Sequence, residues 1–398
     1  MKQYGRFIDY LIELNIILLI FAFPLNLGFF NKLWMSLIII WLSGKILRQD
    51  SVVMPPSGYF LLVFIGTIVI SVIFSKQPDV SRGSVMYCIK GIALCMVLFD
   101  FSGHDEKRID RIVHYFMASA LMAAFYAFYQ LFCLKGIDTR AHSFFYNTFY
   151  LALWSGIGIL AAISKLLAKP SKLSFYAYEV SLLILGAALM LSKTRAPLIA
   201  VGIVLLIIVF YVPDKIKSLK YLAVFGVVTL LLFIYDETLR MRALSIFDSN
   251  TELRWTIWSQ TLALIKAKFW MADWLIGRGP GVFKSEYIQF DHINYPFTFP
   301  HMIPVELFYA FGLMGVVAFL TWFIFLMYRL NGLLKNNTLD LHIKYIGLWP
   351  ALVFLICLIN ESFFSRYFSF SFWFFTGILL ALLRIEKAAV EKKGAVLD

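Results

Sequence analysis

Residues 302–328 read MIPVELFYAFGLMGVVAFLTWFIFLMY, and Glu306 is the one residue among them with a charged side chain. A helix needs about 20 consecutive, mostly apolar residues to cross the hydrocarbon core of a bilayer, so this run predicts a transmembrane helix. Comparable apolar runs occur at 8–26, 29–46, 58–75, 84–101, 111–134, 145–164, 174–192, 196–213, 219–235, 345–360 and 367–384. The sequence therefore predicts an all-α integral membrane protein, a polytopic bundle of about twelve transmembrane helices in a single membrane-embedded domain over residues 1–398.

The composition agrees with this class. Apolar residues make up 61% of the 398-residue chain, aromatic residues 18% and charged residues 15%, whereas a soluble domain has about 25% charged residues. A soluble enzyme, a disordered chain and a secreted disulfide scaffold are therefore excluded. The four cysteines lie in apolar runs without the spacing of a metal site or a disulfide framework, and we expect no metal and no cofactor.

The formal net charge of +12 follows the distribution expected of a membrane protein. With a cytoplasmic N-terminus, short cytoplasmic loops and termini carry 20 Lys and Arg residues, and short loops on the other side carry 8. The positive-inside rule then predicts that both termini are cytoplasmic and that 236–301 is a long loop on the outer side of the membrane. The excess of positive charge is thus explained by membrane topology and by contact with membrane lipids, and we expect no nucleic-acid partner.

The 236–301 loop has structure of its own. Trp258, Leu262, Ile265 and Phe269 recur at helical spacing, which predicts an amphipathic helix lying on the membrane surface. A turn cluster, Gly-Arg-Gly-Pro-Gly-Val-Phe, follows at 277–283.

Three features predict a site on the outer side of the membrane. They are Lys193 and Arg195 in a short turn, Arg254 at the start of the loop helix, and His301 between two prolines. Each also has a simpler interpretation, as snorkelling charges, a headgroup contact or a helix cap. Further arginines face the same side, namely Arg140, Arg240, Arg242, Arg278 and Arg366. Because arginine forks match phosphate oxygens in pairs, this arrangement favours a site for a lipid-linked phosphate.

Other residues and absences narrow the chemistry. Lys90 lies within an apolar run, where a charge is costly and is a functional candidate by default. The outer side has no Asp-x-Asp pair, and the chain has no P-loop, dinucleotide fingerprint or nucleophile elbow. A metal-free reaction on a lipid pyrophosphate would need cationic side chains in place of Mg²⁺.

The order of these motifs resembles the O-antigen ligase family, which also includes O-antigen polymerases. The resemblance is carried by His301, Glu306, Gly312 and Gly315 in the pattern H-x₄-E-x₅-G-x₂-G, by Thr194-Arg195-Ala196, by Arg254, and by the 277–283 cluster. It covers roughly residues 140–330 in motifs and the whole chain in hydropathy. One departure is Met302, where the family usually has Asn after the histidine.

The resemblance implies a glycosyltransferase that moves a preassembled polysaccharide from undecaprenyl pyrophosphate onto lipid A–core at the periplasmic face, without a metal and with inversion. His301 would be the general base. The pyrophosphate would be bound by Arg195, Arg254, Lys193, Arg140, Arg278 and Lys90. Glu306, Gly312 and Gly315 would support the site, with Glu306 able to orient His301 only if the helix starts after Pro304.

Two alternatives stay open. An O-antigen polymerase would use the same donor and a different acceptor, and these residues do not distinguish the two enzymes. A transporter of lipid-linked sugars would favour polar residues deep in several spans, whereas the charges here gather at the rim. The oligomeric state and the sugars joined by the enzyme have no signature in the sequence.

Overall fold

The computed structural model describes residues 2–25, 28–134, 141–145, 147–168, 170–244, 253–291, 298–336, 341–358 and 361–394. Every regular element within these ranges is an α-helix. The helices are α1 (Lys2–Ala22), α2 (Phe30–Arg48), α3 (Gly58–Ile73), α4 (Pro78–Ser102), α5 (Glu106–Cys133), α6 (Thr148–Leu167), α7 (Lys172–Leu191), α8 (Arg195–Tyr211), α9 (Lys215–Tyr235), α10 (Glu237–Leu244), α11 (Leu253–Lys268), α12 (Met271–Ile276), α13 (Phe283–Asp291), α14 (Ile303–Lys335), α15 (Leu341–Ile346), α16 (Trp349–Cys357) and α17 (Arg366–Gly394).

The predicted class of polytopic helical membrane protein is confirmed. Within the described ranges, eight helices are long and apolar enough to cross a membrane: α2, α4, α5, α6, α7, α9, α14 and α17. Three shorter apolar helices are α3, α8 and the segment 344–357. All twelve predicted apolar runs coincide with helices, although the run at 345–360 is divided between α15 and α16. The total of twelve membrane spans stays a prediction.

The core of the bundle is built around α6. Almost every residue of α6 is buried, because α5, α7, α8, α15 and α16 all pack on it. The pair α4 and α17 packs closely through small residues: a Cβ on Gly91 would lie 2.2 Å from the Trp373 ring, and one on Gly377 would lie 2.8 Å from the Cys95 carbonyl oxygen. In the absence of a hydrophobic driving force within lipid, such close backbone approach is a main source of helix association.

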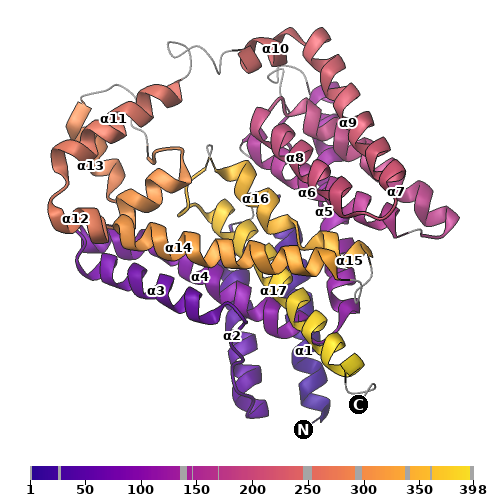
Figure 1. Cartoon of the computed structure of the whole chain (residues 1–398), viewed down its shortest axis with the longest axis horizontal. Coiled ribbons are helices and arrows are strands. Elements are labelled where there is room, and N and C mark those ends of the chain that lie inside the picture. Colours follow the sequence, from indigo (N-terminus) through magenta and orange to yellow (C-terminus); the bar gives the residue numbers. More distant parts are fainter. Residues whose placement is uncertain are drawn as a thin grey trace.

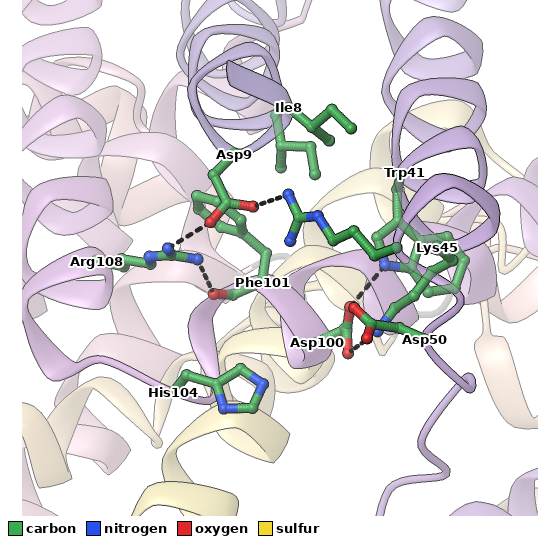
Figure 2. A pocket seen from close by; sticks show the side chains of 12 residues that line it. Ile8, Asp9, Trp41, Lys45, Asp50, Asp100, Phe101, His104 and Arg108 are labelled. Carbon is green, nitrogen blue, oxygen red and sulfur yellow. Dashed lines mark hydrogen bonds and ion pairs between the residues drawn. The ribbon is translucent and has the colours of Figure 1, made fainter. Parts of the chain in front are cut away.

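The two chain termini lie at the same end of the molecule, and α10 and α11 lie at the opposite end (Figure 1). Near the termini, Asp9 of α1 binds both Arg48 (2.6 Å) and Arg108 (2.8 Å). Asp100 of α4 binds Lys45 of α2 at 2.9 Å. These residues line a pocket of about 200 Å³, which Figure 2 shows with its ion pairs. Lys45, Arg48 and Arg108, three of the cations counted in the cytoplasmic loops, therefore also join α1, α2, α4 and α5.

Helices α11, α12 and α13 gather at one end of α14, and α15 lies at its other end (Figure 1). The helix predicted from Trp258, Leu262, Ile265 and Phe269 is confirmed as α11, which ends at Lys268. Ile257, Leu264 and Ile265 are buried, whereas Leu262 is 54% exposed. The buried face packs on Phe283 and Tyr287 of α13 and on Tyr309 of α14, so α11 is part of a small second core. Its position on a membrane surface stays a prediction.

Candidate functional site

His301 lies in the short segment that leads into α14. Its φ is +55°, a conformation that non-glycine residues rarely adopt and that clusters at functional sites. The segment is held from two sides: the Trp258 indole of α11 donates to the Pro300 carbonyl at 3.1 Å, and the Ile303 N–H donates to the Leu358 carbonyl at 2.9 Å. The His301 ring packs on Phe299, with the ring centroids 4.2 Å apart.

The same indole joins the helix that carries Arg254 to the segment that carries His301. Arg254 is the second residue of α11 and precedes Trp258 by four positions, so both residues lie on one face of the helix, about 6 Å apart along its axis. The two predicted site residues come from segments 47 positions apart in sequence, and the Trp258–Pro300 hydrogen bond joins those segments.

The turn with Lys193 and Arg195 joins α7 to α8. Lys193 has a φ of +50°, and its ammonium group forms an ion pair with Asp236 at 2.8 Å. The neighbouring Thr194 hydroxyl lies 3.5 Å from the Thr148 hydroxyl at the start of α6. Lys193 therefore ties its turn to the end of α9, and Arg195 follows as the first residue of α8.

Three arginines on this side of the bundle stand at the beginning of a helix. Arg195 and Arg366 are the first residues of α8 and α17, and Arg254 is the second residue of α11. The positive end of a helix dipole disfavours a cation there by about 0.3–1 kcal/mol. All three side chains are partly exposed. Their placement is thus unfavourable for the helices themselves, and it favours a role in binding an anion.

A cluster of buried carboxylates lies beside the His301 segment. Glu306 accepts hydrogen bonds from the Ser362 hydroxyl and the Phe363 N–H, both at 2.6 Å. Glu361 accepts from the Ser362 N–H at 3.0 Å and from the Tyr150 hydroxyl of α6. Burial raises the pKa of Glu361, against hydrogen bonds that lower it.

This cluster corrects the role expected of Glu306. Helix α14 starts at Ile303, before Pro304, so the condition under which Glu306 could orient His301 is not met. Glu306 instead holds the segment between α16 and α17, and that segment holds the start of α14 through Leu358.

The structure also gives Arg278 a different role from the predicted phosphate ligand. Its guanidinium donates to both carboxylate oxygens of Glu286 (2.7 and 2.5 Å), to Asp273 (2.8 Å) and to the Lys268 carbonyl (2.8 Å). These contacts occupy four of the five N–H groups of an arginine, and the side chain is 9% exposed. Arg278 is therefore an internal tie within the 268–291 segment, and we do not retain it in the site.

The glycines of the family pattern hold the 277–281 turn against α14. Gly312 interrupts α14 with a φ of +62°. The carbonyls of Tyr309 and Ala310 accept from the N–H groups of Arg278 (2.9 Å) and Gly279 (3.1 Å). A Cβ on Gly312 would lie 2.4 Å from the Leu275 backbone. At the same bend, a Cβ on Gly315 would lie 2.1 Å from the Phe311 Cβ, so Gly312 and Gly315 support the site through the fold.

The remaining predicted residues lie elsewhere. Lys90 is in the middle of α4, with its ammonium group 5.5 Å from the centre of the Tyr87 ring and its carbonyl accepting from the Trp34 indole. Arg140 lies outside the described residues. The sequence analysis did not predict Asp236, Tyr150 or Glu361. The position of Glu361 between two apolar runs, in Asn360-Glu361-Ser362, is the signal that could have identified it.

Residues 180–320 match the O-antigen ligase family. The matched segment contains Arg195, Arg254 and His301, and it confirms the resemblance that the motifs predicted. No curated protein sequence matches the chain.

Proposed function

We propose, from the O-antigen ligase match and the proximity of Arg254 to the His301 segment, that the protein is an O-antigen ligase. It would transfer a polysaccharide from undecaprenyl pyrophosphate to the lipid A–core oligosaccharide. The observation that carries the proposal is the Trp258–Pro300 hydrogen bond, because it joins the helix that carries Arg254 to the segment that carries the candidate base His301.

The proposed reaction is a single in-line displacement. A hydroxyl oxygen of the acceptor sugar attacks the anomeric carbon of the donor, and the bond from that carbon to the pyrophosphate oxygen breaks. The electron pair leaves with the pyrophosphate, and the hydroxyl proton passes to the His301 imidazole. The anomeric configuration inverts because the nucleophile enters opposite the leaving group. A positioned general base contributes about 10²–10⁴-fold to such a step.

Arg195 and Arg254 stabilise the charge that develops on the leaving pyrophosphate. A preorganised donor of this kind contributes about 2.7–4 kcal/mol to transition-state stabilisation. Within the described ranges, no group of three or more His, Cys, Asp or Glu side chains could hold a metal ion. We propose that the reaction is metal-independent and that these guanidinium groups carry the positive charge.

The site belongs at the periplasmic face of a bacterial inner membrane. Support comes from the short-loop charge bias and from the position of both termini at the end opposite α10 and α11 (Figure 1). There a lipid-borne donor and a lipid-anchored acceptor can meet without crossing the bilayer.

Reconstitution tests the proposal. Purified protein in proteoliposomes is given undecaprenyl-pyrophosphoryl polysaccharide and lipid A–core, with and without EDTA. The expected product is polysaccharide on lipid A–core, formed equally with and without EDTA. Arg254→Ala is the control that should have strongly reduced transfer activity. Elongated lipid-linked glycan without transfer to lipid A–core would instead identify an O-antigen polymerase, and rescue by Mg²⁺ after EDTA would refute metal independence.

A further inference from the structure

Arg366 lies between the turn that carries Arg195 and the segment that carries His301. It is the first residue of α17 and directly follows the segment that carries Glu361 and Ser362. That segment contacts the start of α14 through Glu306 and through the Ile303–Leu358 hydrogen bond. The residue lies outside the 180–320 family match, so the match assigns it no role.

The Arg366 guanidinium rests on an aromatic platform. It lies 4.8 Å from the centre of the Tyr367 ring and 5.7 Å from that of Phe30, and it donates to the Tyr367 hydroxyl at 2.9 Å. Stacking fixes the plane of a guanidinium, and a fixed plane suits the paired contacts that an arginine fork makes with phosphate. Such a platform lowers the entropy lost when an arginine grips a ligand.

The platform is itself anchored by the carboxylate cluster. Tyr367 stacks on Tyr150 with a centroid separation of 3.8 Å, and the Tyr150 hydroxyl donates to Glu361. Tyr150 is two residues beyond Thr148, whose hydroxyl lies 3.5 Å from that of Thr194, the neighbour of Arg195. A continuous set of contacts thus runs from Arg195 through the start of α6 to Arg366.

The described arginines nearby differ from Arg366 in what surrounds them. Arg278 is enclosed by two carboxylates and a carbonyl. Arg240 of α10 is partly exposed and donates to the carbonyl of Ile234. Arg366 combines partial exposure, a stacked guanidinium and contact with the elements that hold Arg195 and His301.

We infer that Arg366 is a third phosphate-binding arginine of the donor site, and that Tyr150, Glu361 and Tyr367 position it. This inference rests on the proposed function, since it takes the pyrophosphate of the lipid-linked donor as the ligand. Three arginines at the starts of three helices would then surround the leaving group.

Steady-state kinetics of the reconstituted full-length protein tests the inference, with donor and acceptor varied separately. Arg366→Gln should lower kcat/KM for the donor by about 10²–10³-fold and leave KM for the acceptor unchanged. Arg366→Lys should show an intermediate loss, since it keeps the charge without the fork. Arg82→Gln is the matched control, an exposed arginine that pairs with Asp79 outside the proposed site, and should keep the wild-type values.

A positioning role is tested by Tyr150→Phe, which removes the hydroxyl that Glu361 accepts and keeps the ring that stacks on Tyr367. We expect a smaller loss of donor kcat/KM, about tenfold, with KM for the acceptor unchanged. Added guanidinium should restore part of the activity of Arg366→Ala, a rescue that a purely structural arginine would not give.

The outcomes are separable from those of the proposed function. Without any transfer by the wild type, the proposed function fails. If the wild type is active and Arg254→Lys is impaired while Arg366→Gln matches the wild type, this inference alone is overturned. Should Arg366→Gln fail to accumulate, Arg366→Lys decides: a reduced donor kcat/KM supports the inference, and a wild-type value overturns it.

Discussion

Replacing Arg278 by methionine removes the centre of the buried ion network in the 268–291 segment. Four N–H groups of its guanidinium are hydrogen-bonded within 2.8 Å, and the partner carboxylates of Asp273 and Glu286 are 5% and 10% exposed. Removing one partner of a buried ion pair leaves an uncompensated charge and costs about 3–5 kcal/mol. Arg278→Met should therefore destabilise the protein by about that amount, through this segment and its contacts with α14.

The measurement is thermal unfolding of the purified variant in detergent, together with limited proteolysis mapped to 268–291. Earlier cleavage in that segment is expected for Arg278→Met. Combining Arg278→Met with Asp273→Asn and Glu286→Gln removes the uncompensated charges and should recover much of the lost stability. Arg240→Met, at a partly exposed position on α10, is the matched single-site control.

A specific result would refute this reasoning. If Arg278→Met unfolds at the wild-type temperature and resists protease equally well, yet loses donor binding, then Arg278 acts on the substrate. The expectation of a phosphate ligand, set aside because the guanidinium is enclosed, would then be restored.

Four further predictions follow from the site and its topology. A cysteine at the exposed Lys284 position, in a background without native cysteines, should react with an impermeant thiol reagent in intact spheroplasts; reaction only after permeabilisation would reverse the orientation. His301→Gln should lose about 10²–10⁴-fold in turnover, since an amide cannot take a proton, and near-normal turnover would end the general-base assignment. Arg195→Lys and Arg254→Lys should accumulate normally and be well below wild type in transfer assays, and full activity in both would reduce these arginines to generic charge. Gly312→Ala should lower the unfolding temperature, because its Cβ would lie 2.4 Å from the Leu275 backbone; an unchanged temperature would contradict the close packing of α12 on α14.

The tertiary structure separated residues that look alike in sequence. Arg195, Arg254 and Arg278 are all arginines of one predicted side, and only contacts between distant segments show that Arg278 is enclosed by Asp273 and Glu286. Lys193 likewise could not be paired with Asp236 from the sequence, since the two residues are separated by α8 and α9.

The sequence by itself determined the membrane class and the positions of the helices. These follow from local properties: apolar length decides whether a helix can enter a bilayer, and the motif around His301 is contiguous. The tertiary structure alone decided the partner of Glu306, the buried face of α11 and the break in α14 at Gly312. Each depends on which segments pack together. Several residues in the chain could chemically serve as the partner in a given hydrogen bond or ion pair, and the packing decides which of them lies within reach.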